Sequence, residues 1–406
     1  MISSPTGGPA PTPADQRIVY IDVLRGVAVL MIFVVNIKGM TMPFPYYINP
    51  WLWPSPLDEA IAIGQRFVVD DKWRTIFTAL YGAGLVLVGD RYGEDARRLL
   101  ARRNGWLIAF GLIHMIGIWI GDILFFYGVT GLIAMRFSKM SVSRLFWWGG
   151  FCLLLGTIWS AGAEMAPLFD DLIYGVLKDS MWAYNEEVMG YQIAAMLSGV
   201  PEQLQYRLGD AVGYIFYYFL GTGFWLVTLG LMVLGMAFYR AGLLQGRWSV
   251  RTCLWIAVPC LAAAWALDAA QLIFVAGRGG TYDAHLFTSP FLHLDGYLGA
   301  LGYAALISVM VSRGWPLRRL AAVGRMAFTN YIACSLIGTT IAGGHTWGLA
   351  WFGQVALWPL LLVVIGTMIL LLIISPWYLS YFRYGPLEWL WRSLVYRRLQ
   401  PILKRG

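Results

Sequence analysis

The stretch that decides the fold is residues 20–38, which read YIDVLRGVAVLMIFVVNIK. Its middle, residues 27–35, is wholly apolar, and the whole run is close to the ~20 residues that an α-helix needs to cross a bilayer. Asp22 and Arg25 lie near one end, and Asn36 and Lys38 lie near the other. The stretch therefore predicts a membrane-spanning helix with a charged beginning and a polar end.

Two interpretations of the charged beginning stay open. Asp22 and Arg25 are three residues apart, so they share one helical face and their charges can meet. Charged side chains persist inside a span mainly where they are paired or line a polar cavity. The pair is then either a structural ion pair at the membrane boundary or the anion-binding end of a helix whose other end faces a ligand. Charge and spacing alone favour the ion pair, because boundary charges are common.

The composition excludes an ordinary soluble protein. Of the 406 residues, 59% are hydrophobic and 13% are charged, whereas a soluble chain carries about a quarter charged residues. Continuous apolar runs recur along the chain, which indicates an all-α polytopic membrane protein rather than a β-barrel with short alternating segments. The four cysteines lie in apolar runs without CxxC spacing, so neither a disulfide nor a metal site is expected. The net charge of +8 is attributed to cytoplasmic loops, and no nucleic-acid partner is expected.

The apolar runs predict about ten spans in one bundle, residues 18–375. They lie near 18–37, 57–89, 104–120, 122–137, 143–162, 212–239, 252–275, 291–311, 326–343 and 352–375. The second run exceeds one membrane thickness, so we expect its first turns to lie along the surface or the helix to be broken.

Three segments flank or interrupt this bundle. Residues 1–17 are rich in Pro, Gly, Ser and Thr and are predicted to form a disordered cytoplasmic tail without a cleavable signal. The acidic residues 163–210 are predicted to form an outer-face insertion, and the basic residues 376–406 an interfacial C-terminal tail. With the N-terminus inside, the inner loops hold most of the 30 basic residues, which predicts both termini in the cytoplasm.

This topology gathers polar residues in the outer half of the first three spans. We expect a polar pocket there, built from Asn36, Lys38, Asp70, Asp71, Lys72, Arg74, His114, Trp119 and Asp122. Polar groups at such depth are a functional-site hypothesis, in which nearby acids and cations tune His114. The alternative is a self-satisfied ion network that only fixes helix packing, with His114 a hydrogen-bonded core histidine. Near the inner end of the ninth span, Asn330 requires a side-chain or ligand partner, and Arg325 precedes it.

Several motifs carry a resemblance. The segments IDVLRGVAVLMIFVVN, DKWRTIFTALYGAG, RRNGWLIAFGLIHMIGIWIGDILFFYGVTGLI, VGRMAFTNYIACSLIGT and FRYGPLEWLWRSL, in this order, resemble the YeiB-like family, or domain of unknown function 418. The resemblance covers nearly the whole chain after residue 17 and implies a multi-pass protein of the bacterial inner membrane. That family is similar in turn to the transmembrane acyltransferase superfamily, which includes the acyltransferase-3 proteins and the lysosomal heparan glucosaminide N-acetyltransferase.

The first helix departs from the acyltransferase-3 pattern at one position. Those proteins carry an Arg-Gly pair followed eleven residues later by a histidine regarded as catalytic. Here the arginine is Arg25, and the position eleven residues on is Asn36. An asparagine cannot act as a general base, but it can hold a thioester carbonyl or an acceptor hydroxyl by hydrogen bonding. The heparan enzyme also ends its first helix in an asparagine, but no histidine follows here before His114.

The resemblance implies transfer of an acyl group, acetyl first, from acetyl-CoA or another acyl-CoA to a small-molecule, glycan or lipid acceptor at the outer face. Its donor would lie near Asp22, Arg25, Arg325 and Asn330. His114 would deprotonate the acceptor, oriented by Asp70, Asp71 or Asp122, while Asn36, Lys72 or Arg74 would stabilise the oxyanion.

The alternative is a non-catalytic transporter or flippase for a lipid or small molecule on the same scaffold. The missing first-helix histidine favours it, and the lack of matching broken helices or internal repeats in the sequence speaks against it. Membrane lipids and a second copy of the chain, in a homodimer, are the expected partners in either case.

Overall fold

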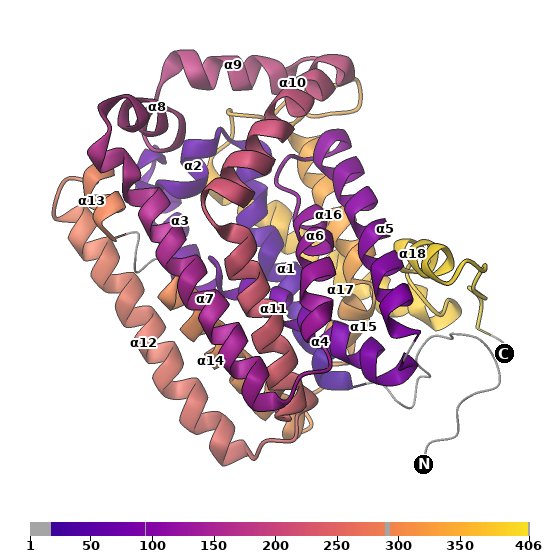
Figure 1. Ribbon diagram of the computed structural model, residues 1–406. Coiled ribbons are helices and arrows are strands. Elements are labelled where there is room, and N and C mark those ends of the chain that lie inside the picture. The colour runs from indigo at the N-terminus through magenta and orange to yellow at the C-terminus, as the bar shows by residue number, and fades with distance from the viewer. Residues whose placement is uncertain (1–17, 94, 289–292, 405–406) are drawn as a thin grey trace.

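The computed structural model describes residues 18–93, 95–288 and 293–404, and this part of the chain is a helical bundle (Figure 1). The only strand-like pairing among these residues is an isolated bridge between Phe382 and Leu403. The long helices are α1 Val19–Thr41, α4 Lys72–Tyr92, α5 Ala96–Gly117, α7 Val142–Met165, α11 Phe224–Arg240, α12 Val250–Ala276, α14 Leu294–Ser312, α16 Ala327–Ala342 and α17 Leu357–Tyr381. The shorter helices are α2 Phe44–Ile48, α3 Pro56–Val68, α6 Leu124–Ala134, α8 Asp171–Met181, α9 Glu186–Leu197, α10 Val200–Gly213, α13 Tyr282–Thr288, α15 Arg318–Arg325 and α18 Pro386–Tyr396. The all-α prediction is confirmed.

Each of the ten predicted spans contains a helix, but fewer of these helices qualify as spans. Within the described residues, five are long and apolar enough to cross a membrane: α1, α7 (extended to Phe169), α12, α14 and α17. Two bent pairs raise this to seven, namely residues 200–221 with α11, bent by 62°, and α15 with α16, bent by 82°. α6 has only 11 residues, and α4 and α5 carry charged ends, so the number ten stays a prediction.

The second predicted span is broken, which was one of the two expectations for its excess length. α3 ends at Val68 and α4 begins at Lys72, with Asp71 in the left-handed region at φ 57°. The left-handed backbone is uncommon for any residue with a side chain. At Asp71 this conformation turns the chain sharply between α3 and α4. The polar side chains on either side of the turn therefore point in different directions.

α1 is the central helix of the bundle. Of its most apolar window, 61% is buried, against 22% to 28% for α7, α12 and α17. It packs on α4, α14, α15, α16 and α17, with Leu24, Ala28 and Phe33 in the main core. The peripheral helices instead expose large apolar side chains, such as Trp147 and Trp255, as lipid-facing surfaces do.

Close packing of α1 depends on glycines. A Cβ on Gly26 would lie 2.0 Å from the Leu320 carbonyl oxygen, and one on Gly324 would lie 1.8 Å from that of Asp22. The backbones of α1 and α15 therefore touch, as small residues allow in membrane helix pairs.

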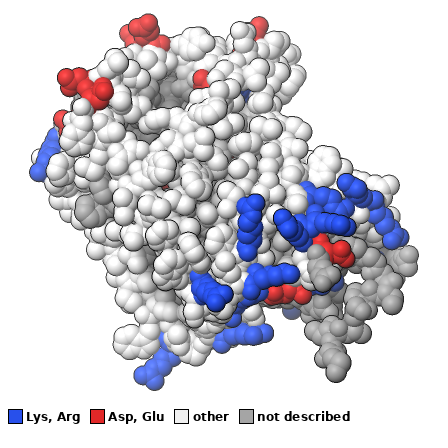
Figure 2. Space-filling model, viewed as in Figure 1, with Lys and Arg blue, Asp and Glu red and all other residues white. Residues whose placement is uncertain are grey.

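Charge separates the two ends of the molecule. In Figure 2, Lys and Arg gather in the lower half, where α18 lies, and acidic residues lie at the top, over α8 to α10. Residues 171–213 thus form a helical cap at the end opposite the basic loops.

Candidate functional site

His114 and Asp122 form a buried pair at the C-terminal end of α5. The His114 side chain is 1% exposed, and its Nδ1 lies 2.8 Å from Asp122 Oδ1. The other carboxylate oxygen accepts a hydrogen bond from the Phe125 backbone N–H at 2.6 Å, which fixes Asp122 at the start of α6. A carboxylate at Nδ1 favours the tautomer that carries its proton there, so the lone pair resides on Nε2.

His114 Nε2 is the free end of this pair. It is buried and has no hydrogen-bond partner among the described residues. Leaving a buried polar atom unsatisfied costs about 1–3 kcal/mol, so such atoms call for a reason beyond packing. A basic nitrogen in this state is suited to receive a proton from a bound acceptor.

Tyr331 lies between His114 and Asn36. Its ring centroid is 5.2 Å from that of His114, and with Asn36 it lines a hollow between α1 and α16. The hollow holds about 170 Å³ of empty space and is too narrow for a water molecule. Its other lining residues are Val29, Ile32, Phe33, Met40, Cys334 and Ser335. The Asn36 side chain is partly exposed, and the hollow beside it must widen before it can hold a ligand.

Trp119 and Lys38 belong to the outer rim of this site. Trp119 Nε1 donates to the Gly39 carbonyl at 3.1 Å, and its ring meets His114 edge to face at 6.4 Å. The Lys38 ammonium is 5.6 Å from the centre of the Tyr47 ring. The Trp119 contact ties the end of α1 to the loop that carries Asp122, and the Lys38 contact ties it to α2.

Lys72 belongs to a different cluster. Its Nζ lies 3.1 Å from Asp268 Oδ2 and 3.1 Å from Asp295 Oδ2, and it donates to the Arg66 carbonyl at 2.8 Å. The Arg66 guanidinium is 3.9 Å from Asp268. Two cations face two carboxylates, so Lys72 lies in a buried ion network that joins α3, α4, α12 and α14, although Asp268 Oδ1 and Asp295 Oδ1 accept no hydrogen bond among the described residues.

Asp71 and Arg74 form a third group. They are paired at 2.7 Å, and Arg74 also lies 4.9 Å from the centre of the Phe224 ring. Asp70 Oδ1 is buried without a partner among the described residues. The predicted outer pocket is thus divided into three clusters, because the break before α4 sends neighbouring side chains to different helices.

An arginine cluster lies at the basic end. Arg25 is 3.5 Å from Asp22, and its Nη2 and that of Arg103 lie 3.9 and 3.6 Å from the position of a Cβ on Gly84. Arg392 of α18 is a further electrostatic neighbour of Arg25. Arg103 lies on the ring of Trp391, at 4.8 Å. Three guanidiniums against one carboxylate leave an excess of positive charge for an anion.

Asn330 does not face this cluster. Its Nδ2 donates to the Val323 carbonyl at 3.0 Å and to Ser375 Oγ at 3.1 Å, so the amide fixes the bend between α15 and α16. Arg325 is the last residue of α15 and follows Gly324, which touches the α1 backbone at Asp22, and the electrostatic neighbours of Arg25 include Arg103 and Arg392. The position of Arg103 in a basic loop and of Arg392 in the basic tail predicts the membrane topology but does not indicate this cluster.

A row of hydroxyls runs between the arginine cluster and the His114 pair. Tyr81 donates to Asn104 Oδ1, and the Thr78 and Tyr127 hydroxyls bond to each other. The rings of Tyr81 and Tyr127 are 5.5 Å apart, and Tyr127 also donates to the Arg74 carbonyl at 3.4 Å. The row supplies polar groups at depths where α4 and α6 would otherwise be apolar.

Sequence reasoning missed Asp268 and Arg103 as site residues. Asp268 is an acid inside the otherwise apolar run 252–275, which is itself a signal of a buried partner. The sequence around Arg103 predicts only a basic loop.

Comparisons with known proteins give a consistent picture. The family model "Protein of unknown function (DUF418)" matches residues 238–398. The "Uncharacterized protein YeiB" of Escherichia coli (strain K12) is 32% identical, over 96% of this chain and 99% of its own length. The "Uncharacterized protein YxaH" of Bacillus subtilis (strain 168) is 28% identical, over 97% and 98% respectively. No solved structure matches.

Proposed function

The chain belongs to the YeiB-like DUF418 family, and from that premise we propose that it is a membrane acyltransferase. It transfers an acyl group, acetyl first, from a CoA-type donor to an acceptor at the outer face of the bacterial inner membrane. The observation that carries the proposal is the His114–Asp122 pair, with Nδ1 held and Nε2 buried and unpartnered.

The chemistry follows from that pair. His114 Nε2 takes the proton of the acceptor hydroxyl or amine, whose oxygen or nitrogen attacks the thioester carbon. The carbonyl oxygen becomes an oxyanion, which the Asn36 amide is placed to hold once the hollow beside Tyr331 opens. The C–S bond then breaks, and the CoA sulfur receives the proton from the imidazolium, which Asp122 stabilises.

The donor binds at the basic end. Arg25, Arg103 and Arg392 supply the excess positive charge that the phosphates of a CoA need. The gathering of Lys and Arg at this end (Figure 2) supports its assignment to the cytoplasm, where a CoA donor is available. The hydroxyl row through Tyr81 and Tyr127 marks the path from donor to acceptor.

A second candidate function is a transporter or flippase without turnover. It is favoured by the bent pairs, 62° at the start of α11 and 82° between α15 and α16, because broken helices form binding sites in transporters. Neither bend is expected from the sequence.

The test measures free CoA released from acetyl-CoA by purified protein, with lipid and glycan acceptor mixtures. Removing a general base costs about 10²- to 10⁴-fold, so His114→Ala should lose activity by that factor while acetyl-CoA still stabilises the protein thermally. Arg25→Ala and Arg103→Ala should lose the thermal stabilisation by acetyl-CoA.

Arg313→Ala is the matched control, because Arg313 is exposed at the end of α14 and should retain both readouts. Full activity of His114→Ala would refute the proposed base. Stabilisation by lipid alone, with acetyl-CoA and CoA silent and no CoA released, would support the transporter instead.

A further inference from the structure

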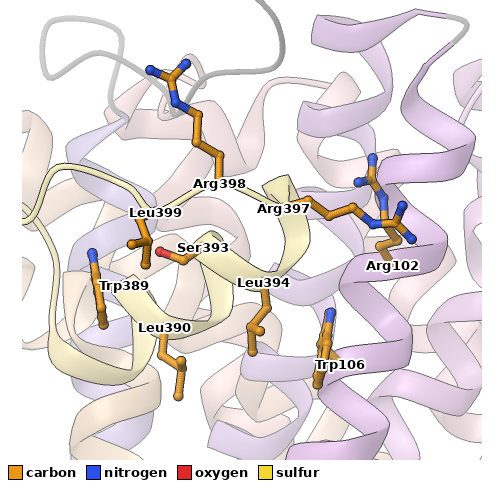
Figure 3. A pocket seen from close by; sticks show the side chains of 9 residues that line it. All are labelled: Arg102, Trp106, Trp389, Leu390, Ser393, Leu394, Arg397, Arg398 and Leu399. Carbon is orange, nitrogen blue, oxygen red and sulfur yellow. The ribbon is translucent and has the colours of Figure 1, made fainter.

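A surface cavity lies between α5 and α18, apart from the His114 site and the inner arginine cluster. Its volume is about 470 Å³, and Figure 3 shows the side chains that line it. They are Arg102 and Trp106 from α5 and, from α18 and the residues after it, Trp389, Leu390, Ser393, Leu394, Arg397, Arg398 and Leu399. No acidic residue of the described part of the chain lines it.

The arginines in this cavity are brought together without a protein counter-charge. Arg397 extends from the end of α18 toward Arg102 on α5, whereas the Arg398 side chain points away from these two (Figure 3). No ion pair joins any of the three to a carboxylate within the described residues. Like charges this close repel one another, so a bound anion would stabilise the arrangement.

The backbone at the end of α18 positions Arg397 and Arg398. Arg397 ends α18 in the left-handed region, at φ 52°, and the Arg398 N–H returns to the Ser393 carbonyl at 3.1 Å. The opposite face of α18 is held in place, since the Trp391 indole donates to the Arg103 carbonyl at 3.2 Å. The cavity therefore has fixed walls rather than two loosely touching helices.

The rest of the lining is apolar and partly exposed. Trp106 is 39% exposed, Leu390 36% and Leu399 76%. The Trp389 indole donates to the Gln400 carbonyl at 2.7 Å, so its ring is fixed as part of the wall. Arginines beside tryptophan and leucine, at the basic end of membrane helices, match the level where lipid headgroups meet acyl chains.

We propose that this cavity binds the headgroup of an anionic glycerophospholipid. Arg102 and Arg397 hold the phosphate through their guanidinium N–H groups, Arg398 adds positive charge at the edge of the cavity, and Trp106, Leu390 and Leu394 contact the glycerol and the first methylenes of the chains. A soluble phosphate would use the arginines and leave the apolar wall uncovered. The site is independent of the acyl-transfer proposal, because it shares no residue with it.

The experiment compares the full-length protein in nanodiscs of phosphatidylcholine alone or with phosphatidylglycerol, and counts retained lipids by native mass spectrometry. The test variant is Arg102→Gln/Arg397→Gln/Arg398→Gln. The control is Arg313→Gln/Arg318→Gln/Arg319→Gln, which removes the same charge from exposed positions around the loop between α14 and α15. A further arm replaces the lipid by inorganic phosphate, and a triple Arg→Lys variant keeps the charge but loses the planar fork.

We expect wild type and control to retain phosphatidylglycerol over phosphatidylcholine and to melt at higher temperature with it. Each arginine near the surface contributes a factor of roughly five, so the test variant should bind about 100-fold more weakly, with the lysine variant between. Equal retention by test and control variants would overturn the proposal. So would stabilisation by inorganic phosphate as large as that by the lipid, or a folded wild type indifferent to phosphatidylglycerol.

Discussion

At the scale of single residues, Glu388 connects the C-terminal helix to the start of α16. Its carboxylate accepts hydrogen bonds from the backbone N–H groups of Phe328, at 2.7 Å, and Thr329, at 3.1 Å, and from the Thr329 hydroxyl. These are first-turn donors of α16, which have no partner within their own helix. A side chain some 60 residues later thus caps this helix.

Replacing Glu388 should therefore weaken the fold at that joint. Burial raises the pKa of Glu388 despite its donors, so a neutral acceptor should replace it in part. Glu388→Ala should lose about 2 kcal/mol of stability and Glu388→Gln about half as much, measured as the melting of the protein in detergent. Glu187→Ala, at an exposed position of α9, is the control and should not change the melting temperature. Equal melting of wild type and Glu388→Ala would contradict the capping role.

The His114–Asp122 contact could be anticipated from sequence, whereas the partners of Lys72 could not. His114 and Asp122 are eight residues apart across a short turn, so topology alone brings them together. Asp268 and Asp295 come about 200 residues after Lys72, and only the packing of α14 on α4 and of α12 on α14 selects them. The sequence therefore indicates that a buried charge such as Lys72 needs a partner, but it does not indicate which residue that partner is.

At the scale of helices, the contact between α1 and α15 should be the least tolerant of added volume. Gly26→Ala would place a methyl group 2.0 Å from the Leu320 carbonyl oxygen, which forces the two backbones apart. Overpacking of this kind costs about 1–3 kcal/mol or more, so we expect a clear drop in the melting temperature.

The matched control is Gly366→Ala in α17, where a Cβ meets nothing within 4 Å. There, alanine should leave stability unchanged or raise it by up to about 1 kcal/mol, because glycine is the poorer helix former. If both variants melt alike, α1 and α15 are not packed as described.

The same region shows why sequence missed the bend between α15 and α16. Residues 318–325 read RRLAAVGR, and this charge predicts a cytoplasmic loop rather than a helix. α15 forms because Ala322, Val323 and Gly324 are buried against its neighbours, which is a tertiary effect. Long apolar runs were predictable; a short helix packed by its partners was not.

At the scale of the whole molecule, the charge separation in Figure 2 predicts a topology. Reporter insertions at Gly190, in the acidic cap, and after Gly314, in a basic loop, test it together with a C-terminal fusion. We expect the Gly190 reporter to be active outside and the other two inside. A Cβ at Gly190 or Gly314 meets nothing within 4 Å, so both positions should accept an insertion. A Gly190 reporter active inside would refute the outer location of the cap, and Gly190 and C-terminal reporters active on the same side would refute the ten-span topology.

The central place of α1 also has a consequence for biosynthesis. α1 leaves the ribosome well before its close neighbour α15, which is made almost 300 residues later, and the Tyr20 hydroxyl donates to Ala304 of α14. Until then its glycine face has only lipid, or an insertion chaperone, to contact. α1 therefore enters the membrane early but is enclosed late, when α14 and α15 pack against it.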